Sequence, residues 1–287
     1  MGPIGDIEVE TSALLKDSNF PAEDFSESVL KCLPPMPWTS VFSVCFACVD
    51  SHFWFSIPDH EYEVRTDLRG ERVFTIDPEG AKDLDDALSI KLNDDGTYDV
   101  GIHIADVSYH VKPNTALDRD ARKRATSVYL VQRVVPMLPP ALSEELCSLL
   151  PGVERLAFSV ILTLTKEAKV IKKWFGKTVV KSAAKLSYNT VQDVLNGKPL
   201  ADVSFTPGHE APSVENDINL LYDLAKVLRT RRFQQGALRL NSPSLSFKLN
   251  DKGLPVDCSQ SSPSEATAIV EEVCIFCESS QIINKCP

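Results

Sequence analysis

The pattern of apolar and polar positions predicts a β-rich segment that begins at Val73. Residues 73–77 are apolar and β-branched, residues 87–92 alternate between apolar and polar side chains, and the strand pattern resumes over 97–107. Between the last two runs, Asn93 to Gly96 has the composition of a hairpin turn. Residues 156–165 and 169–180 have the same character, so they predict a long antiparallel pair that turns at 166–169.

Helical patterns are interleaved with these strands. We expect helices over 117–130, from Ser143, and over 187–195, while three prolines in 134–140 require an extended chain. The longest predicted helix covers 213–235, and its apolar stripe consists of Val214, Ile218, Leu221, Leu224, Ala225 and Leu228. Residues 237–250 again alternate as strands. The pattern therefore predicts an α+β domain from about Val73, with a largely antiparallel sheet and packed helices.

Composition and charge narrow the class of protein. The 287 residues are 43% hydrophobic, which is enough for a sizeable core, and the net charge is −10. Residues 1–30 carry seven acids and one base, and we expect a linker with one short helix there. The acidic N-terminus does not have the form of a secretory signal, so we expect an intracellular protein. The longest apolar stretch, 41–57, is interrupted by Asp50 and His52 and is too short to cross a bilayer, so no membrane span is expected.

Eight cysteines are spread over the chain, as is usual for thiols in a reducing compartment. Two C-x-x-C pairs occur, Cys45 with Cys48 and Cys274 with Cys277. Together they would supply four zinc ligands, but the pairs lie far apart in the chain and each stands in an apolar run without a nearby histidine. We therefore expect buried or incidental thiols and no zinc.

A local basic strip occurs in this acidic chain. Residues 166–185 contain seven lysines and one acid, Glu167, which gives this segment a net charge of +6. Taken alone, each lysine is as expected of a solvated surface, whereas the clustered excess is typical of a surface that contacts phosphates.

Residues 77–86 hold a cluster of acidic side chains that could carry chemistry: Asp77, Asp83, Asp85 and Asp86. Pro78 and Gly80 turn the chain there, so carboxylates from both sides of a loop can converge. Converging carboxylates repel unless a cation lies among them, and hard oxygen ligands favour Mg²⁺. A solvated acidic loop is the alternative. An EF-hand is excluded because the loop lacks glycine at its sixth position and glutamate at its twelfth.

Three segments carry a family resemblance: FTIDPEGAKDLDDALSI (74–90), VGIHIADVSYHV (100–111), and the run from RATSVYL to ILTL (124–164). In this order they resemble the catalytic domain of the ribonuclease II (RNB) family of 3′→5′ exoribonucleases, and are most similar to its Dis3-like branch. The resemblance covers residues 61–272. It implies a partial RNB catalytic domain with the α+β fold described above.

The resemblance also implies an activity and a metal site. Asp77 and Asp86 match Mg²⁺ ligands of the family, with Mn²⁺ as an alternative ion, and Asp83 would complete the metal shell or orient water. Asp85 matches the residue most needed for the chemical step. The implied reaction is hydrolysis of single-stranded RNA to nucleoside 5′-monophosphates. The expected context is a cytoplasmic monomer that degrades RNA, including mRNA, away from membranes.

Further residues match RNA contacts of the family. Tyr188 matches a tyrosine that stacks on bases, and Glu271 and Glu272 match an acidic pair near the terminal nucleotide. A core aromatic and a helix-surface pair are the respective alternatives. From the basic strip, Lys172, Lys173 and Lys177 are candidates for phosphate contacts. His103 and Asp106 lie in a family strand, where we expect structural roles.

The chain departs from the family at both ends. Residues 1–60 have two interpretations, an acidic linker with an anomalous apolar insert over 40–56, or in part a remnant of the family's cold-shock domains. Residues 273–287 read as a divergent tail without a continuing helical stripe. The family's second catalytic half, with its phosphate-binding arginine motif, and its S1 domain have no counterpart. We therefore expect reduced or lost activity, and the alternative function is a catalytically silent RNA- or Mg²⁺-binding fragment.

Overall fold

A computed structural model describes residues 5–34, 56–238, 244–250, 254–261 and 264–279. The chain divides into two compact units, and each is described by itself. Unit 1 consists of residues 1–45, 107–142 and 241–262, and unit 2 of residues 46–106, 143–240 and 263–287. The apolar insert expected over 40–56, except Ser56, and the first C-x-x-C pair lie outside the described residues.

Unit 2 is built on a ring of five strands. These are β2 (Val73–Asp77), β3 (Asp86–Leu92), β4 (Tyr98–Ala105), β7 (Glu154–Leu164) and β8 (Val170–Ser187). They pair in the order β8-β2-β3-β4-β7, and β7 pairs back to β8. The long strand β8 closes the ring because residues 170–181 pair antiparallel with β7 and residues 182–187 pair parallel with β2. The short strand β1 (Thr66–Asp67) pairs parallel with β8, and α3 (Asp59–Val64) precedes it.

The strands expected over 73–77, 87–92, 97–107, 156–165 and 169–180 are confirmed, although β8 continues to Ser187, and the hairpin turn at Asn93 to Gly96 is confirmed as well. Of the strands expected over 237–250, residues 244–249 form one. Gly96 has a φ of +79°, which glycine adopts without strain. The largely antiparallel character is confirmed as well, since β2–β3, β3–β4, β4–β7 and β7–β8 are all antiparallel. The parallel β2–β8 contact was not predicted, because it joins segments that are distant in the chain.

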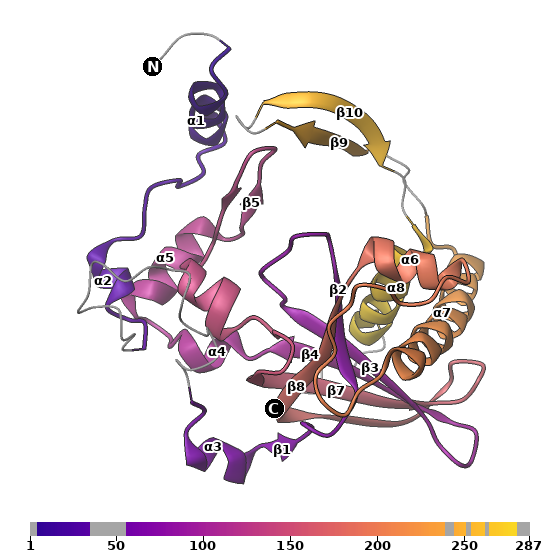
Figure 1. Cartoon of the computed structure of the whole chain (residues 1–287). Helices are drawn as coiled ribbons and strands as arrows, with labels where there is room; N and C mark the ends of the chain where they lie inside the picture. The colour runs from indigo at the N-terminus through magenta and orange to yellow at the C-terminus, as the bar shows by residue number, and fades with distance from the viewer. Residues whose placement is uncertain (1–4, 35–55, 239–243, 251–253, 262–263, 280–287) are drawn as a thin grey trace. The chain divides into compact units, whose positions relative to one another are not determined.

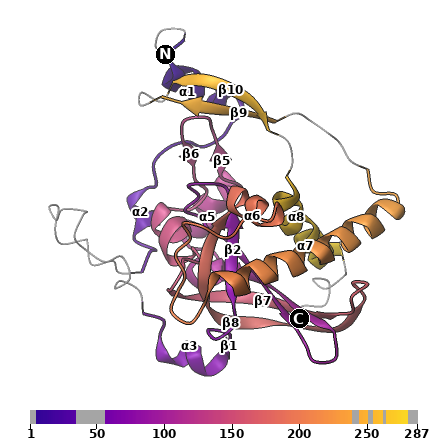
Figure 2. The same ribbon diagram turned by 45° about the vertical axis from the view of Figure 1, so that its right-hand side comes forward.

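Three helices cover the outside of this ring: α6 (Tyr188–Leu195), α7 (Ala211–Gln234) and α8 (Glu265–Ser279). They lie together against one side of the strands in both views (Figures 1 and 2). All six residues of the stripe expected on α7 are buried in the core that these helices share with the sheet. Val273 and Cys277 of α8 are buried there too. The helical pattern was therefore wrongly expected to stop at Glu272, since residues 273–279 continue α8.

The inward face of the ring carries several small or polar residues, among them Ser89, Gly101, His103, Ser159 and Thr178. Helices cannot fit inside five strands, and a small barrel leaves room for little more than such side chains. His103 is buried there between Ser89 and Ser159, with Nε2 2.9 Å from Ser89 Oγ and Nδ1 2.7 Å from Ser159 Oγ. A Cβ on Gly101 would come within 2.6 Å of His103 Nε2. The interior is therefore a packed hydrogen-bond network that requires glycine at position 101.

Unit 1 contains short elements. These are α1 (Ile7–Asp17), α2 (Glu27–Leu30), α4 (Val107–His110), α5 (Ala116–Arg124), the hairpin of β5 (Val128–Tyr129) with β6 (Val134–Val135), and the hairpin of β9 (Ser244–Leu249) with β10 (Pro255–Ser261). Where one short helix was expected within residues 1–30, the described residues 5–30 contain two. The helix expected over 117–130 was too long, because Ala125 takes a φ of +65° and the next residues join the β5–β6 hairpin.

A single π-helical turn, η3 (Ala141–Leu146), occurs where we expected a short helix from Ser143. No helix in the described part of the chain is long and apolar enough to cross a membrane.

Candidate active site

Four acidic residues gather where β2 ends and β3 begins; we call Asp77, Asp83, Asp85 and Asp86 the carboxylate cluster. Asp77 is the last residue of β2, and Asp86 is the first residue of β3. The intervening loop turns at Gly80, and the Asp85 carbonyl accepts a 2.9 Å hydrogen bond from the Ala105 amide of β4. The loop thus holds acids from two neighbouring strands at one end of the ring.

Burial and mutual repulsion disfavour the charged carboxylates. Burial raises the pKa of Asp77 to about 6, and the charges of Asp86 and Asp83 contribute in the same direction, against the nearby Thr75 hydroxyl and Lys185 ammonium. The pKa of Asp85 is also raised to about 6, first by burial and then by Asp83 and Asp86. Burial raises the pKa of Asp86 as well. A cation among these carboxylates would offset both the cost of burying their charges and their mutual repulsion.

The donor set fits a hard cation that needs few protein ligands. Asp77 Oδ2 is buried and makes no hydrogen bond with the residues that the structure describes, so one acceptor oxygen is available to a ligand. Within the residues that the structure describes, no three His, Cys, Asp or Glu side chains are arranged to hold one ion. Mg²⁺ is commonly held by one or two carboxylates, with waters and substrate phosphates as its other ligands. The carboxylate oxygens of the cluster are ligands of the kind that Mg²⁺ prefers.

Tyr188 lies beside the carboxylate cluster. It is the first residue of α6, directly after Ser187, which is the register partner of Asp77 and caps α6 by accepting a hydrogen bond from the Thr190 amide. Burial raises the pKa of Tyr188, and the charges of Asp77 and Asp86 add to this shift. The ring also packs against the core. Tyr188 thus combines a partly buried ring with proximity to the carboxylates.

The strand register separates the candidate lysines. Asp86 pairs with Ile104, Ile104 with Phe158, and Phe158 with Lys177, so all four stand on the outward face. Paired residues share a face of the sheet. Lys177 is exposed, with Nζ 4.0 Å from Asp106 Oδ2.

Lys173 pairs with Leu162, which places it on the same outward face as Lys177. Lys172 instead pairs with Thr163, whose hydroxyl donates a 2.6 Å hydrogen bond to Asp99 on the other face. Of the three lysines, Lys173 and Lys177 therefore share a face with the carboxylate of Asp86.

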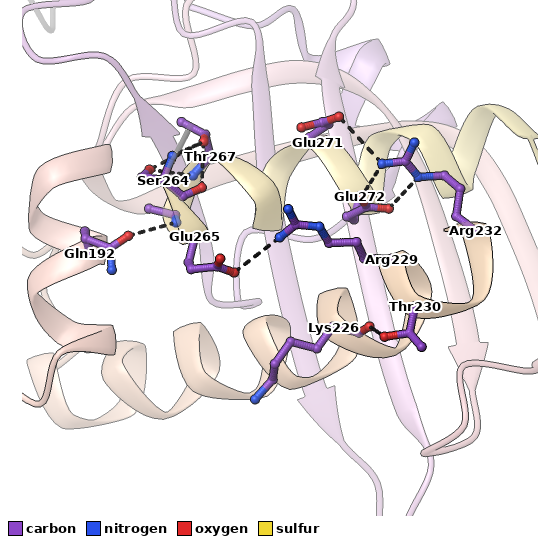
Figure 3. Close-up of polar contacts among 11 residues, drawn as sticks. Gln192, Lys226, Arg229, Thr230, Arg232, Ser264, Glu265, Thr267, Glu271 and Glu272 are labelled. Carbon is purple, nitrogen blue, oxygen red and sulfur yellow. Dashed lines mark hydrogen bonds and ion pairs between the residues drawn. The ribbon is translucent and has the colours of Figure 1, made fainter. Parts of the chain in front are cut away.

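The acidic pair on α8 contacts an arginine of α7. Arg232 donates to both oxygens of Glu272, with 2.9 Å from Nε to Oε2, and its Nη2 lies 3.7 Å from Glu271 Oε1 (Figure 3). Glu272 is buried, whereas Glu271 is exposed. The structure thus places these residues in an interhelical ion pair, a position that sequence reasoning did not distinguish from a free helix surface.

His103 and Asp106 have structural partners, as expected. His103 belongs to the interior network, where burial lowers its pKa to about 4. Asp106 accepts a 2.7 Å hydrogen bond from Nη2 of Arg65, whose side chain is fully buried and also donates to Glu61.

Two residues that hold the aspartate loop were missed from the sequence. Lys185 was counted with the basic strip, yet its Nζ donates to the Ala81 carbonyl of the loop. Ser148 bonds to the backbone of the same loop through its hydroxyl. No local signal in the sequence could indicate either contact, because both partners are distant in the chain.

Comparison with known proteins identifies the family. The model of the RNB domain matches residues 65–280. The chain belongs to the RNB family. It is 44% identical over 284 residues to the DIS3-like exonuclease 2 of Schizosaccharomyces pombe, a match that covers 98% of this chain and 29% of that protein.

Two Arabidopsis thaliana relatives of this RNB chain, one named DIS3-like exonuclease 2 and the other Inactive exonuclease DIS3L2, are each 40% identical over 271 residues. Each match covers 93% of the chain and 24% of the relative. Among solved structures, Mycoplasma genitalium RNase R in complex with ribose methylated single-stranded RNA superposes with a TM-score of 0.82 at 22% identity. That match covers 99% of this chain and 41% of the other, and it shows a shared fold. The chain spans less than a third of the length of the Schizosaccharomyces pombe and Arabidopsis thaliana relatives.

Proposed function

We propose that this chain is part of a Mg²⁺-dependent 3′→5′ exoribonuclease that hydrolyses single-stranded RNA to nucleoside 5′-monophosphates. The observation that carries the proposal is the carboxylate cluster in an RNB domain, with a buried Asp77 oxygen that makes no hydrogen bond among the described residues. Membership of the family alone does not decide activity, since a relative named DIS3-like exonuclease 2 and one named Inactive exonuclease DIS3L2 match this segment equally well.

In this proposal Asp77 and Asp86 hold the metal ion. When bound, Mg²⁺ would supply positive charge to the phosphate oxygens and lower the pKa of a water molecule. Asp85 is the carboxylate most needed for hydrolysis of the RNA phosphodiester bond, and Asp83 orients the water molecule. The burial of Asp77 favours this use of the site, because a carboxylate in surroundings of low polarity acts more strongly on a substrate than in water.

Two features of the outward face support RNA binding. Tyr188 offers an aromatic ring beside the cluster, and stacking on such a ring tolerates any base. Lys173 and Lys177 add positive charge on the face that carries Asp86. We propose that a single strand of RNA approaches the cluster along the part of this face that carries Lys177 and the exposed Ile104, because the helices cover the part around Leu162. We propose that the protein acts as a monomer. The cytoplasmic location and the role in mRNA decay stay predictions.

A catalytically silent RNA- or Mg²⁺-binding chain is the second candidate. It is favoured by the similarity to the relative named Inactive exonuclease DIS3L2, which is 40% identical over 271 residues. Such a chain would retain RNA and Mg²⁺ without cleavage.

The test uses purified chain, a 5′-labelled single-stranded RNA and Mg²⁺, beside an Asp85→Asn variant. Shortening of the RNA from its 3′ end with release of nucleoside 5′-monophosphates, by the unmodified chain alone, is the expected result. Retention of intact RNA by both proteins would instead establish the silent chain. An Asp94→Asn variant is the matched control, because Asp94 lies in the exposed hairpin turn between β3 and β4. It should cleave as the unmodified chain does.

A further inference from the structure

The aspartate loop needs support from outside itself. It brings four carboxylates together between Asp77, the last residue of β2, and Asp86, the first residue of β3. Within the loop, the Ala81 amide donates a 3.1 Å hydrogen bond to the Pro78 carbonyl. Repelling groups tend to move apart, and a loop that must hold them requires bonds to a rigid neighbour.

Ser148 supplies such bonds on both sides of Asp83. Its hydroxyl donates a 2.6 Å hydrogen bond to the Lys82 carbonyl and accepts a 3.2 Å hydrogen bond from the Leu84 amide. The next amide, of Leu149, donates a 2.9 Å bond to the Leu84 carbonyl. Ser148 and Leu84 are both fully buried. One side chain thus fixes the backbone before and after Asp83, immediately ahead of Asp85.

Arg155 fixes Ser148 in turn. Its Nε donates a 3.0 Å hydrogen bond to the Ser148 carbonyl, and its Nη2 donates a 2.9 Å bond to the Glu145 carbonyl. Arg155 lies near the start of β7 and is 7% exposed. A buried guanidinium that donates to backbone carbonyls holds a segment in one shape, because it offers several donors in a rigid plane. The ring is thereby linked to residues 145–148, and through Ser148 to the aspartate loop.

We propose that Ser148 is a positioning residue of the carboxylate cluster, whose hydroxyl sets where Asp83, Asp85 and Asp86 stand. This inference rests on the proposed function insofar as the cluster binds a divalent ion. Ser148 touches neither the ion nor RNA, and acts through the backbone of residues 82–84.

The chain offers a matched control. Ser182 is also buried, at 1% exposure, but its hydroxyl has no hydrogen-bond partner in the described part of the chain. Ser148→Ala and Ser182→Ala therefore remove the same atom from two buried sites, and only the first breaks bonds to the loop. The probe is Mn²⁺, whose binding to the whole chain is followed by electron paramagnetic resonance, together with amide hydrogen exchange across residues 80–88.

Ser148→Ala should weaken Mn²⁺ binding by roughly ten-fold, as loss of an outer support of a metal site commonly does. Exchange at the Leu84 amide should become faster while exchange in β4 stays unchanged. Ser182→Ala should leave both measurements as in the unmodified chain. If Ser148→Ala does not fold, Ser148→Cys, which retains a weak donor of similar size, should show smaller changes of the same kind.

Unchanged Mn²⁺ affinity and unchanged Leu84 exchange in a folded Ser148 variant would overturn the inference, as would equal effects from Ser182→Ala. Failure of the proposed nuclease function would give different results from failure of this inference. Mn²⁺ binding without RNA hydrolysis by the unmodified chain would contradict the nuclease and leave the positioning role intact. Absence of Mn²⁺ binding by the unmodified chain would contradict the metal site, and the Leu84 exchange would then decide the role of Ser148.

Discussion

Asp77 and Ser187 are register partners at the ends of the parallel strands β2 and β8. Because Ser187 also caps α6, the strand pairing places the first residue of that helix, Tyr188, beside the carboxylate of Asp77. A segment identified from its acids and an aromatic residue more than a hundred positions later thus lie next to each other.

Replacement of Tyr188 should distinguish stacking of its ring on an RNA base from packing of the ring in the protein core. Tyr188→Ala should weaken binding of single-stranded RNA by about 1–3 kcal/mol, the usual contribution of one stacked base. Tyr188→Phe keeps the ring and should bind nearly as the unmodified chain. Fluorescence anisotropy with a labelled oligonucleotide measures this. If Tyr188→Ala lowers the free energy of unfolding in urea but leaves the affinity for RNA unchanged, the ring is only part of the core.

Substitutions of two lysines test whether RNA contacts the outward face of the ring. Lys177→Ala should lower the slope of log K against log salt by about 0.7, the value for one phosphate contact on a single strand. Lys172→Ala changes the net charge equally but lies on the other face of β8, paired with Thr163. It should leave the slope unchanged. Equal effects from the two variants would mean that general charge, and not a defined path, attracts RNA.

Gly101 should tolerate no side chain. A Cβ there would lie 2.3 Å from Ser89 Oγ and 2.6 Å from His103 Nε2, so Gly101→Ala should lower the free energy of unfolding by about 1–3 kcal/mol. Gly70→Ala is the control, because a Cβ at that position meets nothing within 4 Å. Denaturation in urea compares the two. A neutral Gly101→Ala would show that the ring interior is not closely packed.

His103 should make stability depend on pH. Burial lowers its pKa in the folded chain to about 4 from the ordinary 6.5, so the unfolded chain binds more protons between these values. The contribution of neutral His103 to the free energy of unfolding is fully present above pH 6.5. It falls as the pH decreases toward 4, by about 3 kcal/mol in total.

The measurement for His103 is the free energy of unfolding in urea at several pH values. His103→Gln, which does not titrate, should flatten the curve in this range, whereas His60→Gln should not, since His60 is exposed. A curve that keeps its slope in His103→Gln would assign the pH dependence to other groups.

The sequence by itself determined the local elements and the acidic loop. Strand alternation, the turn at Asn93 to Gly96 and the apolar stripe of α7 depend on neighbours in the chain, so their patterns predicted elements that the structure contains. The position of Asp77 at a strand end and of Asp86 at a strand start could be predicted for the same reason.

Only the tertiary structure decided which distant residues meet. The parallel pairing of β8 with β2 brings Tyr188 to the aspartates, and the register of β7 with β8 separates Lys177 from Lys172. The pairing of Glu272 with Arg232 and the bonds of Ser148 to the aspartate loop likewise join separate segments. Such contacts depend on how strands close into a ring and how helices pack on it, and no local periodicity encodes them, because register and packing are set by burial across the whole domain.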